Sequence, residues 1–261
     1  MSGFSADWLD LRAPADLRAR NTSLAQHLAA HFARHSHLRV LDLGAGSGNN
    51  MRATAPLLPA PQHWVLADAD DVLLSRAARS LPGRVTAQCE ITDLSVDATH
   101  LVRRVRPQLV TASAFFDLCG KDFIDRLADA LTEARTVLYA VLSYDGREEW
   151  EPPSALDEAA LAAFHADQRR DKGLGRALGP DAHGYLAQCL ADRGFAVEEG
   201  RSDWDLAAPA DAGLIEALAE GSAGAISDHL GPATAAAWLD AHRHARRVVI
   251  GHRDLLAFPP K

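Results

Sequence analysis

The chain has 261 residues, 48% of them hydrophobic and 24% charged, with a formal net charge of −8 at pH 7. These values predict one globular domain with a sizeable core. The acidic balance argues against DNA or bulk RNA as partners, because their phosphates attract basic proteins. Three cysteines without C-x-x-C spacing predict free thiols. Since we find neither a leader pattern nor a run of ~20 apolar residues, we expect a cytoplasmic protein without a membrane partner.

Residues 7–37 are expected to be helical, because Leu24, Leu28 and Phe32 recur every four residues. Three histidines share this spacing: His27, His31 and His35. Histidines at i and i+4 can chelate a metal, but no carboxylate or cysteine completes a ligand set here, so we predict no metal site.

A strand at 40–43 leads into glycines at alternate positions and then into the start of a helix. Such a strand, glycine turn and helix predict a nucleotide-type pocket in an open α/β sheet. A dinucleotide site would need G-x-G-x-x-G, and Asn49 stands where its third glycine belongs. The stretch resembles motif I of the class I S-adenosylmethionine (SAM)-dependent methyltransferases, an acidic residue followed by G-x-G-x-G. The resemblance implies SAM as cofactor, S-adenosylhomocysteine as product, and cofactor contacts from Asp42, Gly44, Ala45, Gly46, Ser47, Gly48, Asn49 and Asn50.

A helix over 49–58 and a second strand from His63 come next, and this strand closes on carboxylates. Asp68 comes 20 residues after Gly48, where nucleotide-binding α/β folds have the acid that accepts from the ribose. Asp70 is the alternative, although it is better suited to cap the helix expected from Val72. The family resemblance likewise makes Asp68 the match to motif II.

The third and fourth strands end on the next candidate residues. After the strand at 84–88, Asp93 and Leu94 resemble the family's adenine-binding pair, although Asp is also a common helix N-cap. After the strand that begins at Pro107 comes the region of motif IV, which in this family lines the methyl group. The resemblance assigns Ser113 and Ala114 to the cofactor and Phe115 to the substrate. Asp117 is a candidate acid or base, or the cap of a helix over 121–133.

The most hydrophobic run, 135–144, predicts the fifth strand, at the centre of a parallel sheet. A helix over 155–169 and a glycine-rich basic loop then suggest a substrate-binding insertion, because cations and backbone amides bind carboxylate or phosphate. The substrate candidates beside Phe115 are Tyr144, Trp150, Arg169, Lys172 and Arg176. Tyr144 and His165 join Asp117 as candidate catalytic residues, since a hydroxyl acceptor would need a base.

A helix over 181–194, a sixth strand at 194–200 with an edge at 202–206, helices over 211–247 and a strand at 247–258 complete the chain. With the resemblance, this order predicts a Rossmann-like, doubly wound, seven-stranded and mostly parallel sheet. We expect helices on both faces, an antiparallel last strand, N-terminal helices and a helical insertion after the fifth strand. The single domain 1–261 divides into an N-terminal helical segment (1–37), a SAM-binding half (38–145), a substrate or cap insertion (146–182) and the C-terminal part of the sheet (183–261).

The interpretation is a SAM-dependent methyltransferase that methylates an oxygen or nitrogen of a small polar or anionic metabolite. Two alternatives stay open. A nicotinamide-dependent oxidoreductase could use the same scaffold, although the glycine spacing and the lack of a Tyr-x-x-x-Lys pair disfavour it. A non-catalytic SAM-binding protein is the other, because motif IV carries no diagnostic catalytic residue. The oligomeric state is left undetermined.

Overall fold

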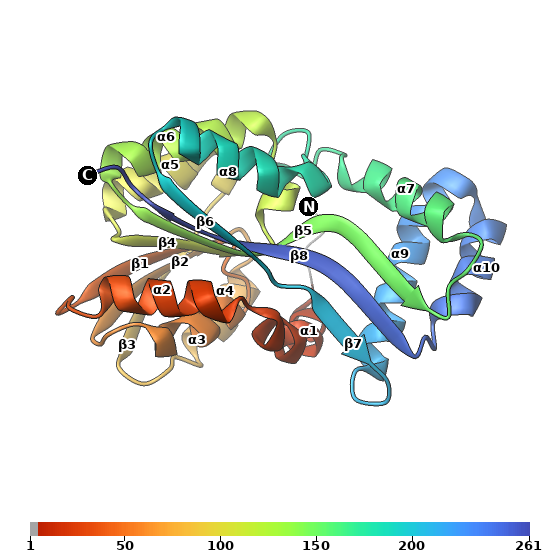
Figure 1. Ribbon diagram of the computed structural model, residues 1–261. Helices are drawn as coiled ribbons and strands as arrows, with labels where there is room; N and C mark the ends of the chain where they lie inside the picture. The colour runs from red at the N-terminus through yellow and green to blue at the C-terminus, as the bar shows by residue number, and fades with distance from the viewer. Residues whose placement is uncertain (1–4) are drawn as a thin grey trace.

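One eight-stranded sheet organises residues 5–261, which are the residues described by this computed structural model (Figure 1). Residues 1–4 lie outside the described residues. The predicted N-terminal segment and the stretch searched for a leader both begin with them. The strand order is β3-β2-β1-β4-β5-β8-β6, and β7 pairs separately with β8. The strands are β1 (Leu38–Leu43), β2 (Gln62–Asp68), β3 (Val85–Ile91), β4 (Leu109–Ser113), β5 (Val137–Glu151), β6 (Ala196–Arg201), β7 (Trp204–Ala207) and β8 (Arg247–Phe258).

The pairing confirms the predicted fold class. Strands β1 to β5 pair in parallel, and β8 pairs antiparallel with both β5 and β6. The sheet therefore contains the predicted path of seven strands with an antiparallel last strand. The predicted edge at 202–206 is the separate strand β7, an eighth strand that runs along the far end of β8.

Helices cover both faces of the sheet, as Figure 1 shows, with α2, α3 and α4 on one side and α5, α6 and α8 on the other. Two buried clusters correspond to these faces, and their side chains come from opposite sides of the same strands. The helices are α1 (Ala6–Ala19), α2 (Thr22–Phe32), α3 (Asn49–Thr54), α4 (Asp71–Ala78), α5 (Leu94–Val105), α6 (Lys121–Ala134), α7 (Asp157–Gln168), α8 (Ala182–Asp192), α9 (Ala212–Leu230) and α10 (Pro232–His242). Short 3₁₀ turns lie at Ala55–Leu57, Phe116–Leu118 and Gly179–Asp181. No helix among residues 5–261 has the length and apolar character that a membrane crossing requires.

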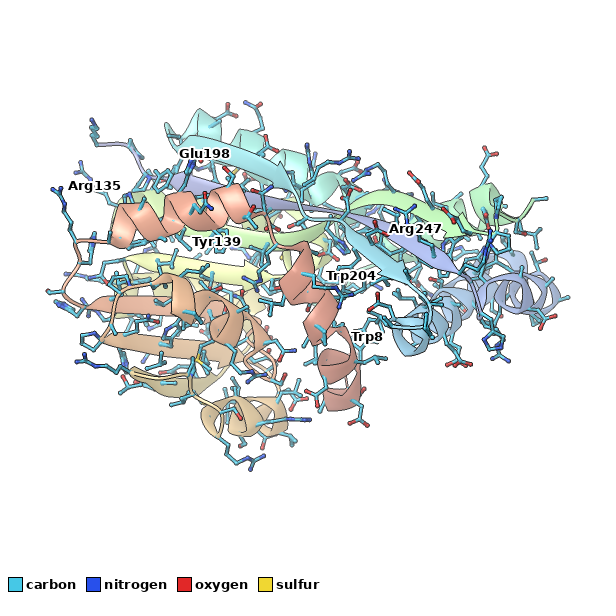
Figure 2. All side chains as sticks on the ribbon, turned by 60° about the horizontal axis from the view of Figure 1, so that its bottom comes forward. Trp8, Arg135, Tyr139, Glu198, Trp204 and Arg247 are labelled. Carbon is cyan, nitrogen blue, oxygen red and sulfur yellow. The ribbon has the colours of Figure 1, made fainter. Side chains whose placement is uncertain are left out.

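The N-terminal segment is two helices rather than the continuous helical stretch expected from its apolar spacing. The chain breaks at Asn21, whose side chain accepts from the Leu24 amide at 3.1 Å and so caps α2. The backbone amide of Asn21 donates to the buried carboxylate of Asp254 on β8 at 2.8 Å. This long-range bond holds the break in place, and α1 therefore leaves the direction of α2 and passes beside β7, with Trp204 pointing toward it (Figure 2).

Strand β5 extends to Glu151, seven residues beyond its predicted end at 144. Residues 148–151 pair with β8, and two register shifts separate this stretch from the buried start of β5. At the first shift Leu142 has φ +57°, and its amide donates to Asp254 at 2.8 Å. The extended β5–β8 pair carries β7 and leads to α7, α9 and α10, away from the other helices (Figure 1). Residues 145–151 are mostly charged, so the sequence gives no apolar pattern that would predict a strand there.

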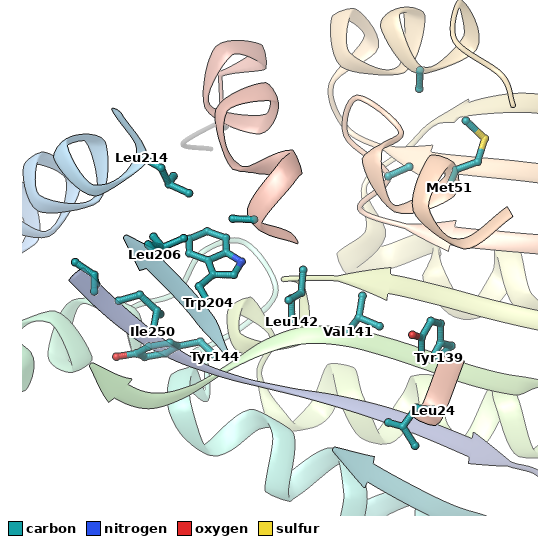
Figure 3. Packing of buried hydrophobic residues seen from close by; sticks show 14 of the residues in the cluster. Leu24, Met51, Tyr139, Val141, Leu142, Tyr144, Trp204, Leu206, Leu214 and Ile250 are labelled. Carbon is teal, nitrogen blue, oxygen red and sulfur yellow. The ribbon is translucent and has the colours of Figure 1, made fainter. Parts of the chain in front are cut away.

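Apolar side chains on this extended pair join the larger of the two core clusters. Figure 3 shows Trp204 and Leu206 of β7 close to Leu214 of α9, while Tyr144 and Ile250 lie on the β5–β8 pair. The far end of the pair is therefore part of the same domain core, since it shares buried contacts with the main sheet.

Burial of α2 against the sheet predicts a large stability difference between two leucines. Leu28 is completely buried, whereas Leu17 on α1 is 59% exposed. Leu28→Ala should lower the free energy of unfolding by about 2–5 kcal/mol, because it leaves a cavity in the core. Leu17→Ala should change it by less than about 0.5 kcal/mol. Chemical denaturation measures both, and an equal loss in the two variants would contradict the packing of α2 described above.

Candidate cofactor and substrate cleft

A cleft of about 710 Å³ opens at the carboxyl ends of the first four strands, where open α/β sheets bind ligands. The loops after β1, β2, β3 and β4 form its floor, while α1 and a loop at 172–174 form its sides. Its lining includes eleven of the thirteen residues predicted for the cofactor, namely Gly44, Ala45, Gly46, Ser47, Asn49, Asn50, Asp68, Asp93, Leu94, Ser113 and Ala114. Gly48 and Asp42 do not line it: Gly48 is the N-cap residue of α3, and Asp42 lies within the sheet.

The glycine loop has a backbone that only glycine adopts readily. Gly44 has φ +66°, and a Cβ there would lie 2.8 Å from the Phe115 ring. Gly46 has φ +50°, and Leu9 of α1 lies 3.2 Å from the position of its absent Cβ. Positive φ and close neighbours together explain why the turn uses glycine. The loop consequently presents bare main chain to the cleft.

Asp42 anchors this loop from below. Its Oδ1 accepts from Thr111 Oγ1 on β4 at 2.7 Å and from Asn50 Nδ2 on α3 at 2.6 Å. Burial raises the pKa of Asp42 to about 6, although these hydrogen bonds oppose the change. Asp42 thus joins β1, β4 and the first turn of α3.

Asp68 lies at the end of β2, and its two oxygens accept from two backbone amides. Gly46 N donates to Oδ2 at 2.8 Å and Asp70 N donates to Oδ1 at 3.0 Å. Asp70 accepts from the amides of Val72 and Leu73, so it caps α4 as expected. Both carboxylates line the cleft, but Asp68 is the one that contacts the glycine loop.

The residues after β3 and β4 complete the floor. Asp93 caps α5 by accepting from Ser95 N at 2.9 Å, and this hydrogen bond lowers its pKa. Leu94 is buried beside it. After β4, Ala114 has φ +49°, which is unusual for a residue with a side chain. The strained backbone turns the chain across the cleft toward Phe115.

None of the three candidate catalytic residues lines the cleft. Asp117 is in the 3₁₀ turn after β4, and its Oδ1 is buried without a hydrogen-bond partner among the described residues. Burial raises the pKa of Asp117 to about 6, against the effect of Arg12 and Lys172. Tyr144 and His165 form a pair, with Tyr144 Oη 3.0 Å from His165 Nε2. Burial raises the pKa of Tyr144 and lowers that of His165.

The predicted substrate residues are divided among three cavities. Phe115 and Lys172 line the main cleft. Arg169 and Arg176 line a neighbouring cavity of about 540 Å³ beside α6. Trp150 lines a third cavity in the distal helices. Tyr144 does not line any of these three.

Most cations of the predicted basic loop have carboxylate partners. Arg169 pairs with Asp181 at 2.9 Å, and Asp167 pairs with Arg170 at 2.7 Å and with Lys172 at 3.0 Å. These pairs reduce the positive field of the loop. Lys172 alone of them reaches the main cleft, with 28% of its side chain exposed.

Three cleft residues from α1 were missed by the sequence analysis: Leu9, Arg12 and Asp16. Arg12 Nε and Asp16 Oδ2 are 3.0 Å apart and both side chains are about nine-tenths buried. Trp204 Nε1 donates to Asp16 Oδ1 at 3.1 Å, and the Arg12 guanidinium lies 5.1 Å from the centre of the Trp204 ring. Their i, i+4 spacing is typical of an exposed helix pair, so only tertiary contacts identify them.

The helix histidines contact different neighbours. His27 Nδ1 lies 2.6 Å from Glu198, and His31 contacts the rings of Phe32 and Phe258. Within residues 5–261 we find no group of three or more potential metal ligands.

Comparison with solved structures identifies the class of fold. The structure is similar to a cyclopropane-fatty-acyl-phospholipid synthase-like protein from Lactobacillus casei, with a TM-score of 0.56, 15% identity, and coverage of 97% of this chain and 98% of that one. It is similar to the cyclopropane synthase MmaA2 from Mycobacterium tuberculosis, with a TM-score of 0.53, 11% identity, and coverage of 97% and 94%. It is also similar to the YcgJ protein from Bacillus subtilis, with a TM-score of 0.52, 14% identity, and coverage of 92% and 100%. No family model and no curated protein matches the sequence. The chain therefore has a Rossmann-like fold, which it shares with these proteins.

The raised pKa of Asp42 predicts a pH-dependent stability. Between about pH 4 and pH 6 the folded protein keeps this proton while the unfolded chain, with an Asp pKa of 3.8, has lost it. The free energy of unfolding should therefore fall as the pH rises through this window, and Asp42 should contribute about 3 kcal/mol of the fall. Asp42→Asn should remove that part of the pH dependence, because an amide does not titrate.

Chemical denaturation at several pH values measures this effect, with the exposed Asp240→Asn as control. The raised pKa of Asp117 also makes the free energy of unfolding fall as the pH rises. The Asp42→Asn profile is therefore compared with the wild-type profile, because neither is expected to be flat. An Asp42→Asn profile parallel to that of the wild type would show that Asp42 titrates normally.

Proposed function

We propose that this protein binds SAM in the main cleft and transfers its methyl group to a small acceptor. One observation carries the proposal: the glycine loop, Asp68 and the Asp93–Leu94 pair line a single cleft in the order that the methyltransferase resemblance requires. The glycine loop would lie under the amino-acid end of SAM, Asp68 would accept from the ribose hydroxyls, and Asp93 would accept from the adenine amine.

The residues of the loop suit a ligand that approaches main chain. A Cβ on Gly44 would lie 2.8 Å from the Phe115 ring, and one on Gly46 would lie 3.2 Å from Leu9. Ser47 Oγ is buried without a hydrogen-bond partner among residues 5–261. SAM supplies a methyl group already activated by its sulfonium. The protein's part is then to orient the acceptor and exclude water, which Phe115, Leu118 and Leu174 would do as apolar residues of the cleft.

We further propose a small polar or anionic acceptor that is methylated on oxygen or nitrogen. Arg12 and Lys172 are the cations of the cleft, and a carboxylate or phosphate could bind between them. Among the three candidate bases, Asp117 has a pKa raised by burial to about 6, and its Oδ1 has no competing partner among the described residues. A nitrogen acceptor that arrives neutral would need no base.

Calorimetric titration with SAM, S-adenosylhomocysteine, NADH and NADPH tests the cofactor class. We expect saturable binding of the two adenosyl ligands alone. Asp68→Ala should weaken SAM binding by about 1.5–3 kcal/mol, the range for a hydrogen bond to a charged group. Asp70→Ala should keep SAM affinity and lower stability by about 1 kcal/mol, because it removes the α4 cap.

Three results would contradict this assignment in different ways. Binding of a nicotinamide cofactor instead of SAM would favour an oxidoreductase. Loss of SAM affinity in Asp70→Ala rather than in Asp68→Ala would move the ribose contact by two residues. Saturable SAM binding without turnover on any metabolite fraction would favour a non-catalytic SAM-binding protein.

The acceptor proposal is tested by methyl transfer from labelled SAM to metabolite fractions separated on an anion-exchange resin. We expect the methylated product in the retained fractions. Lys172→Gln should then lower kcat/KM by about tenfold to a hundredfold, mainly through KM, since it removes a charged contact to the acceptor. Arg170→Gln, in the same loop but outside the cleft, is the matched control. Equal effects of the two substitutions would argue against an anionic acceptor at Lys172.

A further inference from the structure

A third cavity, of about 270 Å³, lies at the far end of the β5–β8 pair between β5, α7, α9 and α10. It shares no lining residue with the main cleft. Neither the glycine loop nor the proposed methyl transfer explains it.

Aromatic rings form much of its wall. Trp150 of β5 and Trp238 of α10 meet edge to face with centres 5.2 Å apart, and Phe164 of α7 lines the same space. Each indole N–H donates to a carboxylate, Trp150 to Glu148 at 3.2 Å and Trp238 to Asp157 at 3.0 Å. The carboxylates thereby hold the two indole rings in place.

The charged residues that line this cavity are all acidic. Glu148, Asp157 and Glu158 line it, and none of the described lining residues is a lysine or arginine. Within residues 5–261 neither Glu148 nor Glu158 forms an ion pair, and Asp157 pairs only with His242, whose Nε2 is 2.6 Å away. Elsewhere in the protein, carboxylates commonly pair with arginine.

Glu148 is held by two hydrogen bonds. Its Oε1 accepts from Tyr144 Oη at 2.9 Å and its Oε2 accepts from Trp150. Burial raises the pKa of Glu148, although the hydrogen bonds from Tyr144 and Trp150 oppose this change, and the nearby Asp157 also raises it. Glu148 is an enclosed carboxylate without an ion pair, which is costly, so a bound cation would stabilise it.

From the aromatic walls and the acidic lining we infer that this cavity binds a small organic ammonium ion. The faces of tryptophan and phenylalanine attract cations, and the carboxylates supply the opposite charge. Because the described residues include no cluster of three metal ligands, an organic cation suits the site better than a metal ion. The volume is suited to a small ion rather than to a larger ligand.

Choline and its neutral carbon isostere 3,3-dimethylbutan-1-ol are the probes, because they share shape and differ in charge. Calorimetry on the full chain without SAM should show saturable choline binding that is about tenfold or more tighter than that of the isostere. Tryptophan fluorescence gives a second readout through Trp150 and Trp238. Equal affinity for the two probes, or no saturable choline binding in the millimolar range, would overturn the inference.

Glu148→Gln keeps the side-chain shape and removes the charge, so it should weaken choline binding about tenfold. Glu149→Gln, the adjacent residue outside the lining, is the matched control and should leave choline binding unchanged. Phe164→Leu tests the aromatic wall independently if Glu148→Gln fails to fold, and it should also weaken choline binding. Choline affinity retained in a folded Glu148→Gln or in Phe164→Leu would contradict the site. SAM titration of the same variants is a separate readout, since failure of SAM binding bears only on the main cleft.

Discussion

The buried carboxylate of Asp42 is the interaction on which the main cleft depends. It is completely enclosed, and enclosure of a charge is costly unless hydrogen bonds compensate. The bonds from Thr111 and Asn50 join two neighbouring strands to the helix after the glycine loop. Part of the cost remains, because the pKa is still raised. The glycine loop is therefore anchored on the sheet side by Asp42, and its opposite side lines the cleft.

A second buried acid, Asp254, sets the arrangement of the rest of the chain. Its two oxygens accept from the amides of Leu142 and Asn21. One bond stabilises the irregular turn of β5, and the other stabilises the break between α1 and α2. As a result, α1 lies over the cleft while β5 and β8 continue beyond the sheet. One side chain thus couples the wall of the main cleft to the extended strand pair that carries the third cavity.

The main cleft and the distal cavity are lined by different sets of charged residues. The main cleft contains Arg12 and Lys172 together with several acids, of which Asp68 contacts the glycine loop. The distal cavity is acidic and aromatic, with no lysine or arginine among its described lining residues. A lysine and an arginine line the main cleft only, so the two cavities offer different charged groups to a ligand. The proposed acceptor site and the inferred ammonium site are therefore chemically distinct.

The sequence by itself determined the fold class and predicted eleven residues that line the main cleft. Asp68, Asp93 and the glycines each come at or just after the end of a strand, so their spacing along the chain encodes their position at one edge of the sheet. Only the tertiary structure decided the position of Arg12 and Asp16, because an i, i+4 pair looks the same on any exposed helix. It also decided the length of β5, whose charged residues 145–151 become a strand through pairing with β8. Local pattern specifies which residues lie at the end of each strand, whereas contacts between distant segments specify which helix covers the cleft and where Trp150 lies.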